Sequence, residues 1–356
     1  MDWDSSGSIV EISDMYLSAR RKARRSLAIV FALLALIVLP LAGCDSESLL
    51  SSPGSDSELA LRVLDNNAMI LGHIDISSGL EFIRSFAPEA DLDGLNTEEG
   101  YSELVSRTGI DPLTDIKGAY FALSQAENDT DGALLMFIDF DQVDLIELIE
   151  EQEEMIRLTS TDFGDAFRSP DDELFIAFHE GRLMLLASTE SELVRMSDRM
   201  TDGGPSAAHD ELIQKVNRNQ HWAVIRNVDQ ALLEGVDLAG ELGQLGQISS
   251  TIEEIGLSAS FTTDDIEASL FIRPIENVSP EDLESLIAGI RAAARIQLAE
   301  TPEILEFTDR FDISSDSRFV EVSIELETEE LRELQDQFGE DLRSTLSKRF
   351  HKKSQD

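Results

Sequence analysis

The chain has 356 residues, of which 71 are acidic and 28 basic, so its formal net charge at pH 7 is −43. So acidic a surface is repelled by the phosphates of nucleic acids, and this excludes a nucleic-acid-binding role. The single cysteine excludes an intrachain disulfide and a zinc site made of several thiolates.

The N-terminal segment has three parts in series. Residues 20–25 are basic, residues 27–39 form an apolar run of 13 residues, and small residues follow up to Cys44. That run is shorter than the roughly 18–20 apolar residues that span a bilayer. Basic, apolar and small parts in this order are typical of an export signal, so residues 1–43 are predicted to be a cleaved signal peptide. Met15 is an alternative start, because the basic part would then follow it directly.

The end of this segment, Leu41-Ala42-Gly43-Cys44, resembles the lipobox of bacterial lipoproteins. In that family the chain is cut before the cysteine, which here is between Gly43 and Cys44. The cysteine thiol receives a diacylglyceryl group, and the new N-terminus is acylated. The resemblance implies a protein of the cell envelope, held to a membrane through Cys44 on the periplasmic or cell-surface side. It extends no further than Cys44, and it leaves open which membrane and which leaflet.

The acidity that remains after removal of residues 1–43 has two interpretations. This part has 23 basic and 67 acidic residues, for a net charge of −44. One interpretation is a solvated surface adapted to high salt, and the other is a surface that binds cations or a cationic partner. Acidic residues occur along every segment, which favours salt adaptation.

Residues 44–58 are rich in serine and acidic residues and are predicted to be a flexible tether. Apolar strand patterns and helix stripes with capping residues then predict two halves. For the first half, residues 59–206, we expect a strand at 68–76, a helix at 77–86 capped by Ser77 or Ser78, strands at 116–124 and 133–140, a helix at 141–156, strands at 174–179 and 182–188, a helix at 190–200 and a linker at 201–206. For the second half, residues 207–356, we expect a strand at 221–228, a helix at 230–245, strands at 255–261 and 266–272, a helix at 280–298, strands at 307–313 and 319–326, and a helix at 329–350.

The two halves are expected to be copies of one α+β unit. Each has the order β-α-β-β-α-β-β-α, and three corresponding elements lie 133–138 residues apart: the strands that begin at 133 and 266, the helices at 141 and 279, and the helices at 190 and 328. Tight hairpins predict mainly antiparallel sheets, with helices over one face. The two half-sheets would either join edge to edge or stack, and we expect both faces to be mostly covered.

Candidate chemistry is sparse in this sequence. His73 and His221 each lie in the first strand of a half, so we expect them to be structurally equivalent; no histidine pair has helical metal-site spacing. Residues 127–132 imitate the start of a calcium loop, but Ile138 stands where a bidentate carboxylate is needed. No nucleophile elbow, phosphate loop or dinucleotide fingerprint occurs, and no cofactor or metal is predicted.

The sequence therefore favours a lipid-anchored binding, scaffolding or envelope-assembly protein without evident catalysis. Its expected partners are the membrane, through the lipid on Cys44, and an envelope protein. Two alternatives stay open: a hydrolase of envelope material that uses paired carboxylates, and a carrier of a hydrophobic ligand.

Overall fold

The computed structural model describes residues 55–86, 105–106, 110–111, 114–125, 130–138, 142–151, 155–158, 165–228, 250–262, 264–297 and 302–332. The predicted signal peptide, Gly43 and Cys44 lie outside these residues. Within them, no helix combines the length and apolar content that crossing a membrane would require.

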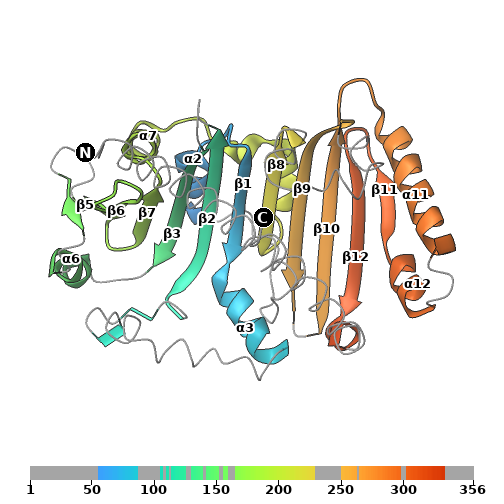
Figure 1. Cartoon of the computed structure of the whole chain (residues 1–356), viewed down its shortest axis with the longest axis horizontal. Helices are drawn as coiled ribbons and strands as arrows, with labels where there is room; N and C mark the ends of the chain where they lie inside the picture. The colour runs from blue at the N-terminus through green and yellow to red at the C-terminus, as the bar shows by residue number, and fades with distance from the viewer. Residues whose placement is uncertain are drawn as a thin grey trace, which may run out of the picture.

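All strands that the structure describes belong to one antiparallel sheet, which runs across the described part of the molecule (Figure 1). The strands are β1 (Ile70–Asp75), β2 (Ile116–Gln125), β3 (Thr130–Ile138), β4 (Ile156–Arg157), β5 (Asp165–Arg168), β6 (Phe175–His179), β7 (Leu183–Ala187), β8 (His221–Arg226), β9 (Ile252–Phe261), β10 (Asp265–Pro274), β11 (Asp312–Ser315) and β12 (Val320–Glu327). Their spatial order is β11-β12-β10-β9-β8-β1-β2-β3-β7-β6-β5-β4. The mixed helix and strand content and the antiparallel pairing confirm the α+β class.

The two half-sheets join edge to edge through β1 and β8, which pair antiparallel from Ile70↔Ile225 to His73↔Trp222. Outward from this join, one side has the order β1-β2-β3-β7-β6 and the other β8-β9-β10-β12-β11. The join places the first strand of each side at the middle of the sheet. It therefore leaves no free edge between the two sides.

Helices cover the sheet unevenly. They are α2 (Ser55–Val63), α3 (Ile76–Phe86), α6 (Gln142–Glu151), α7 (Glu190–Asp202), the 3₁₀ turn η1 (Ala207–His209), α8 (Glu211–Val216), α11 (Pro280–Gln297) and α12 (Pro302–Asp309). Apolar residues of α2, α7 and α8 share one core cluster with Leu71, Leu135 and Val224, which define the α8 face of the sheet. On the opposite face, named the α3 face, Phe82 of α3 packs with Phe261 and Ile266, while α6 and α11 cover the two outer parts.

Local capping explains two helix boundaries. The Thr189 side chain accepts a hydrogen bond from the Glu192 backbone N–H and starts α7, and Gly203, with φ of 72°, ends it. The Asp210 side chain accepts from the N–H groups of Leu212 and Ile213 and starts α8.

Several sequence-based expectations need correction in the first half. Helix α2 begins at Ser55, inside the expected tether, because Leu61 and Leu64 bury themselves against the sheet. The Asp75 carboxylate, and not Ser77 or Ser78, accepts the N–H of Ser78 at the start of α3. The first half also contains β4 and β5, which were not predicted because two and four residues are too short to show alternation.

The second half differs from expectation in two elements. Helix α12 occupies the first three residues of the stretch that was predicted as the strand 307–313, and β11 begins only at Asp312, because Pro302 can start a helix and Phe307 packs edge-on against Phe311. Helix α8 was not predicted, since its apolar residues are few in sequence. The helix expected at 230–245 lies outside the described residues.

Candidate functional site

One row of cross-strand partners crosses the α8 face of eleven strands. In spatial order this central row consists of Ala166, Ala177, Leu185, Leu135, Tyr120, His73, Trp222, Ser258, Ser269, Ser323 and Asp312. On the first side, Leu135 and Leu185 are fully buried beneath the α2 and α7 cluster. On the second side the row is polar, and its exposure increases outward from buried Ser258 to exposed Asp312.

The polar side of the row lies within a larger open face. On β10 and β12, successive residues that point to the α8 face are charged or polar up to Phe271 and Phe319, which lie beneath Lys215 of α8. Within the described part of the chain, no helix packs on the α8 face of β11 and β12. We call the α8 face of β9 to β12 beyond Phe271 the open face.

The open face carries six carboxylates. They are Asp265, Glu267, Asp312, Glu321, Glu325 and Glu327. Among the described residues, none of the six has a lysine or arginine nitrogen within ion-pair distance. Ser260 and Ser269 donate long hydrogen bonds of 3.4 Å and 3.5 Å to Glu267 and Glu321. The open face is therefore a surface with an excess of negative charge, although Arg310, paired with Glu330, also interacts electrostatically with Glu327.

A partly buried ion network around the buried Glu254 closes the end of the open face that lies beside α8. Arg226 contacts Asp210 at 3.1 Å and Glu254 at 3.2 Å, and Glu254 contacts Arg273 at 2.5 Å. Arg226 also donates to the backbone carbonyls of Asn66, at 2.9 Å, and Ala68, at 3.2 Å. Burial raises the pKa of the Glu254 carboxyl, and the nearby Arg273 acts in the opposite direction.

This network serves structure and not acid–base chemistry. Its carboxylate with a raised pKa, Glu254, is buried between two arginines, where a substrate has no access. The network ties β8, β9 and β10 to the cap of α8 and to the chain before β1. Sequence reasoning missed it, although Glu254 inside a strand pattern was an available signal.

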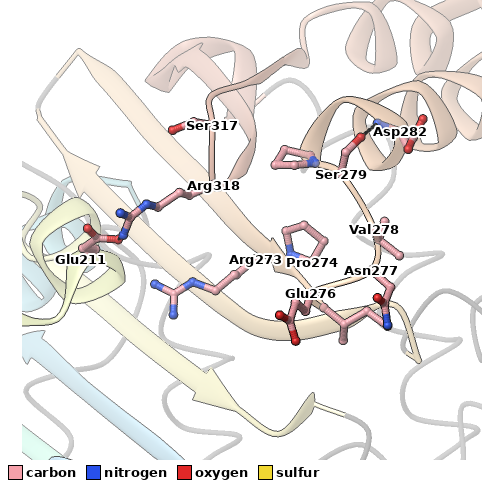
Figure 2. A pocket seen from close by; sticks show the side chains of 12 residues that line it. Glu211, Arg273, Pro274, Glu276, Asn277, Val278, Ser279, Asp282, Ser317 and Arg318 are labelled. Carbon is pink, nitrogen blue, oxygen red and sulfur yellow. Dashed lines mark hydrogen bonds and ion pairs between the residues drawn. The ribbon is translucent and has the colours of Figure 1, made fainter.

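A depression opens beside the network, at the ends of β10 and α11 (Figure 2). It measures about 700 Å³ and is open to solvent. Figure 2 shows the side chain of Arg318 directed at Glu211, with which it forms an ion pair. It also shows the hydrogen bond that the backbone N–H of Asp282 donates to the Ser279 hydroxyl. The depression is lined by side chains of both charges. It therefore differs from the deep apolar pocket that we would expect in a carrier of a hydrophobic ligand.

The structure separates the two histidines that were expected to be equivalent. His73 pairs across strands with Trp222 and stacks on Tyr120, with 4.2 Å between ring centroids, so it lies on the α8 face. His221 precedes Trp222 and packs against Phe261 on the α3 face. The expected equivalence is therefore wrong, because strand neighbours point to opposite faces. Burial lowers the pKa of each imidazole to about 4.

The remaining sequence candidates do not assemble into a site. No group of three metal-ligating side chains occurs among the residues that the structure describes. In the proposed calcium loop, residues 126–129 lie outside the description, and Asp131 forms an ion pair with Arg195 at 2.9 Å. Asp131 therefore anchors α7 to β3.

Comparisons with known proteins give only a distant likeness. No family model matches the chain, and no curated protein matches it. Two solved structures described as crystal forms III and I of TP0453 are similar, with TM-scores of 0.45 and 0.43 and identities of 11% and 9%. The likeness to form III covers 77% of this chain and 96% of that chain; for form I the shares are 77% and 94%.

Proposed function

We propose that this protein is a lipid-anchored, extracytoplasmic binding or scaffolding protein that presents its open face to a partner in the cell envelope. The open face carries the proposal. Beyond α8, the α8 face of these four strands is polar and uncovered by described helices, while the corresponding side of the other half is apolar and covered. A surface without an enclosed cavity suits a macromolecular partner better than a small substrate.

The anchoring rests on the signal features of the sequence. A basic segment, a short apolar run and the small residues before Cys44 support export and lipidation. We expect the intact mass of protein made in a bacterial host to show loss of residues 1–43 and gain of acyl chains. Cys44→Ser protein should lose both changes, and a Cys44→Ser protein that is still cut and acylated would contradict the proposal.

We further infer that the two halves arose by duplication. The matched strand order about the β1–β8 join supports this origin. So does the central row, in which Tyr120 and Ser258 take corresponding places 138 residues apart, as do Leu185 and Ser323. If one copy then lost the helices that cover its α8 face, a sheet face that had packed against helices would become an exposed face like the open face.

Photo-crosslinking in living cells tests the binding role. A photoreactive residue at Ser323, on the open face, should give a discrete protein adduct, and the same residue at exposed Glu190 on α7 should not. Reversing the charge of Glu267 and Glu325 should remove the Ser323 adduct. Equal adducts from both positions, or none from Ser323, would count against the open face as a binding surface.

A further inference from the structure

One stretch beyond the described residues, residues 342–355, has the opposite charge to the open face, although the preceding residues 333–341 carry four acidic residues. Residues 342–355 contain no acidic residue and five basic ones, which are Arg343, Lys348, Arg349, Lys352 and Lys353. Only six lysines occur in the whole chain, and three of them are in this basic segment. So local a concentration of positive charge, in a chain of net charge −43, calls for a negative surface within reach.

We propose that the basic segment, residues 342–355, docks on the open face of the same chain. Six carboxylates without a described ion-pair partner lie on that face. Four of them gather where β12 ends, because Asp265 pairs with Glu327 and Glu267 with Glu325. The complementary charges thus lie a short distance apart along the chain.

The length of the intervening chain permits this docking. The described chain ends at Arg332, and ten residues, which make eleven residue-to-residue steps, separate it from Arg343. They span about 16 Å if helical and up to about 36–40 Å if extended. The ten residues of β10 span about 33 Å. An extended connection is therefore long enough to bring the basic segment to the carboxylate-rich end of the open face.

The path must pass round the end of the sheet. Leu331 packs with the cluster of Phe82, Phe261 and Ile266, so the chain leaves β12 over the α3 face. Gly339 lies between Leu331 and the basic segment, and glycine is favoured where a helix ends and the chain changes direction. A short connection also gives the segment a millimolar effective concentration at the open face.

The inference holds whether or not an envelope partner also binds the open face. If one does, the partner must displace the basic segment, which would make it an intramolecular competitor. Because the contacts are exposed ion pairs, the docked state should weaken as salt is raised.

Zero-length carbodiimide crosslinking of the full chain in an uncharged detergent tests the docking. Crosslinks join a lysine amine directly to a carboxylate, and mass spectrometry locates both residues. We expect Lys348, Lys352 and Lys353 to link mainly to Glu267, Glu325 and Glu327 within one chain. Changing these three glutamates to lysine should reduce the tail crosslinks at least tenfold.

A charge exchange separates specific docking from general attraction. Changing Lys348, Lys352 and Lys353 to glutamate in the variant with three lysines on the open face should restore the crosslinks. Reversing three exposed carboxylates elsewhere, Glu190, Asp202 and Glu281, should leave the original crosslinks unchanged.

Three outcomes would overturn the proposal. The first is crosslinks spread over carboxylates of the whole surface, or confined to the α3 face. The second is a failure of the charge exchange to restore them. The third is binding of the basic segment to vesicles containing phosphatidylglycerol in preference to the open face, seen as loss of the intramolecular crosslinks when such vesicles replace the detergent.

Discussion

The two sides of the sheet have the same strand order about the β1–β8 join but opposite chemistry on the α8 face. On the first side the central row is Tyr120, Leu135 and Leu185, buried under α2 and α7. On the second side Ser258, Ser269 and Ser323 take the corresponding places. Two sides can therefore share a strand order and differ in the helices that cover them. Backbone pairing determines the strand order, and side-chain polarity determines whether helices cover the face.

The two sides differ because the helix that follows the last strand of each side packs on a different face of the sheet. Helix α7 follows β7 and places Leu193 and Met196 on the α8 face. The helix that begins at residue 328 follows β12 and places Leu331 against the α3 face. A sheet face that loses its helix must become polar to remain soluble, and the serines and carboxylates of the open face meet that need.

Exchange of one residue of the central row between the two sides should have the largest effect. Leu135→Ser removes a fully buried side chain and buries a hydroxyl, so the free energy of unfolding should fall by about 3–5 kcal/mol. Ser269→Leu, at the corresponding place on the open face, should change it by less than about 1 kcal/mol. Urea unfolding measures both, and equal losses would show that the two sides are covered alike.

Removal of a buried ion-network residue should have the next largest effect. Arg226→Ala leaves Glu254 and Asp210 without their shared cation, at a cost of about 3 kcal/mol. Arg157→Ala, in an exposed pair with Glu150 on the first side, should cost less than about 1 kcal/mol. If chemical denaturation gave equal costs, the network would not be the tie between α8 and the sheet that its burial indicates.

Acid sensitivity should follow from the two histidines at the join. The folded pKa of His221 is about 4, below the ordinary 6.5, so stability is lost as pH falls through 6.5 towards 4. This loss is about 2 kcal/mol at pH 5 relative to a variant without the imidazole. His221→Leu should therefore reduce the difference in unfolding free energy between pH 7 and pH 5 by that amount. An unchanged difference in the His221 variant would refute the assignment.

Charge repulsion on the open face should have the smallest effect. Glu267→Gln with Glu325→Gln removes two unpaired charges and should stabilise the protein by a few tenths of a kcal/mol in dilute buffer. In 1 M salt, where the Debye length is about 3 Å, the gain should vanish. The midpoint of thermal unfolding of the original protein should also rise with salt. A gain that persists in 1 M salt would point to a packing effect.

Local patterns allowed much of the fold to be predicted from the sequence. Alternating apolar residues and tight turns predicted the β6–β7 and β9–β10 hairpins, and the capped apolar stripe from Pro280 predicted α11. These signals depend on neighbours in the chain, so they survive without tertiary information. The signal peptide that we propose up to Cys44 rests on the same kind of local pattern, because export chemistry acts on an unfolded sequence.

Only the tertiary structure decided which residues share a face and which face is covered. The register of β1 against β8 pairs His73 with Trp222, and a shift of one residue would have made the two histidines equivalent. Likewise, serines at 269 and 323 are ordinary strand residues in the sequence, and they become an open face only because the helix after β12 packs on the other side. Register and helix direction depend on contacts between residues far apart in the chain, and a local pattern contains no information about them.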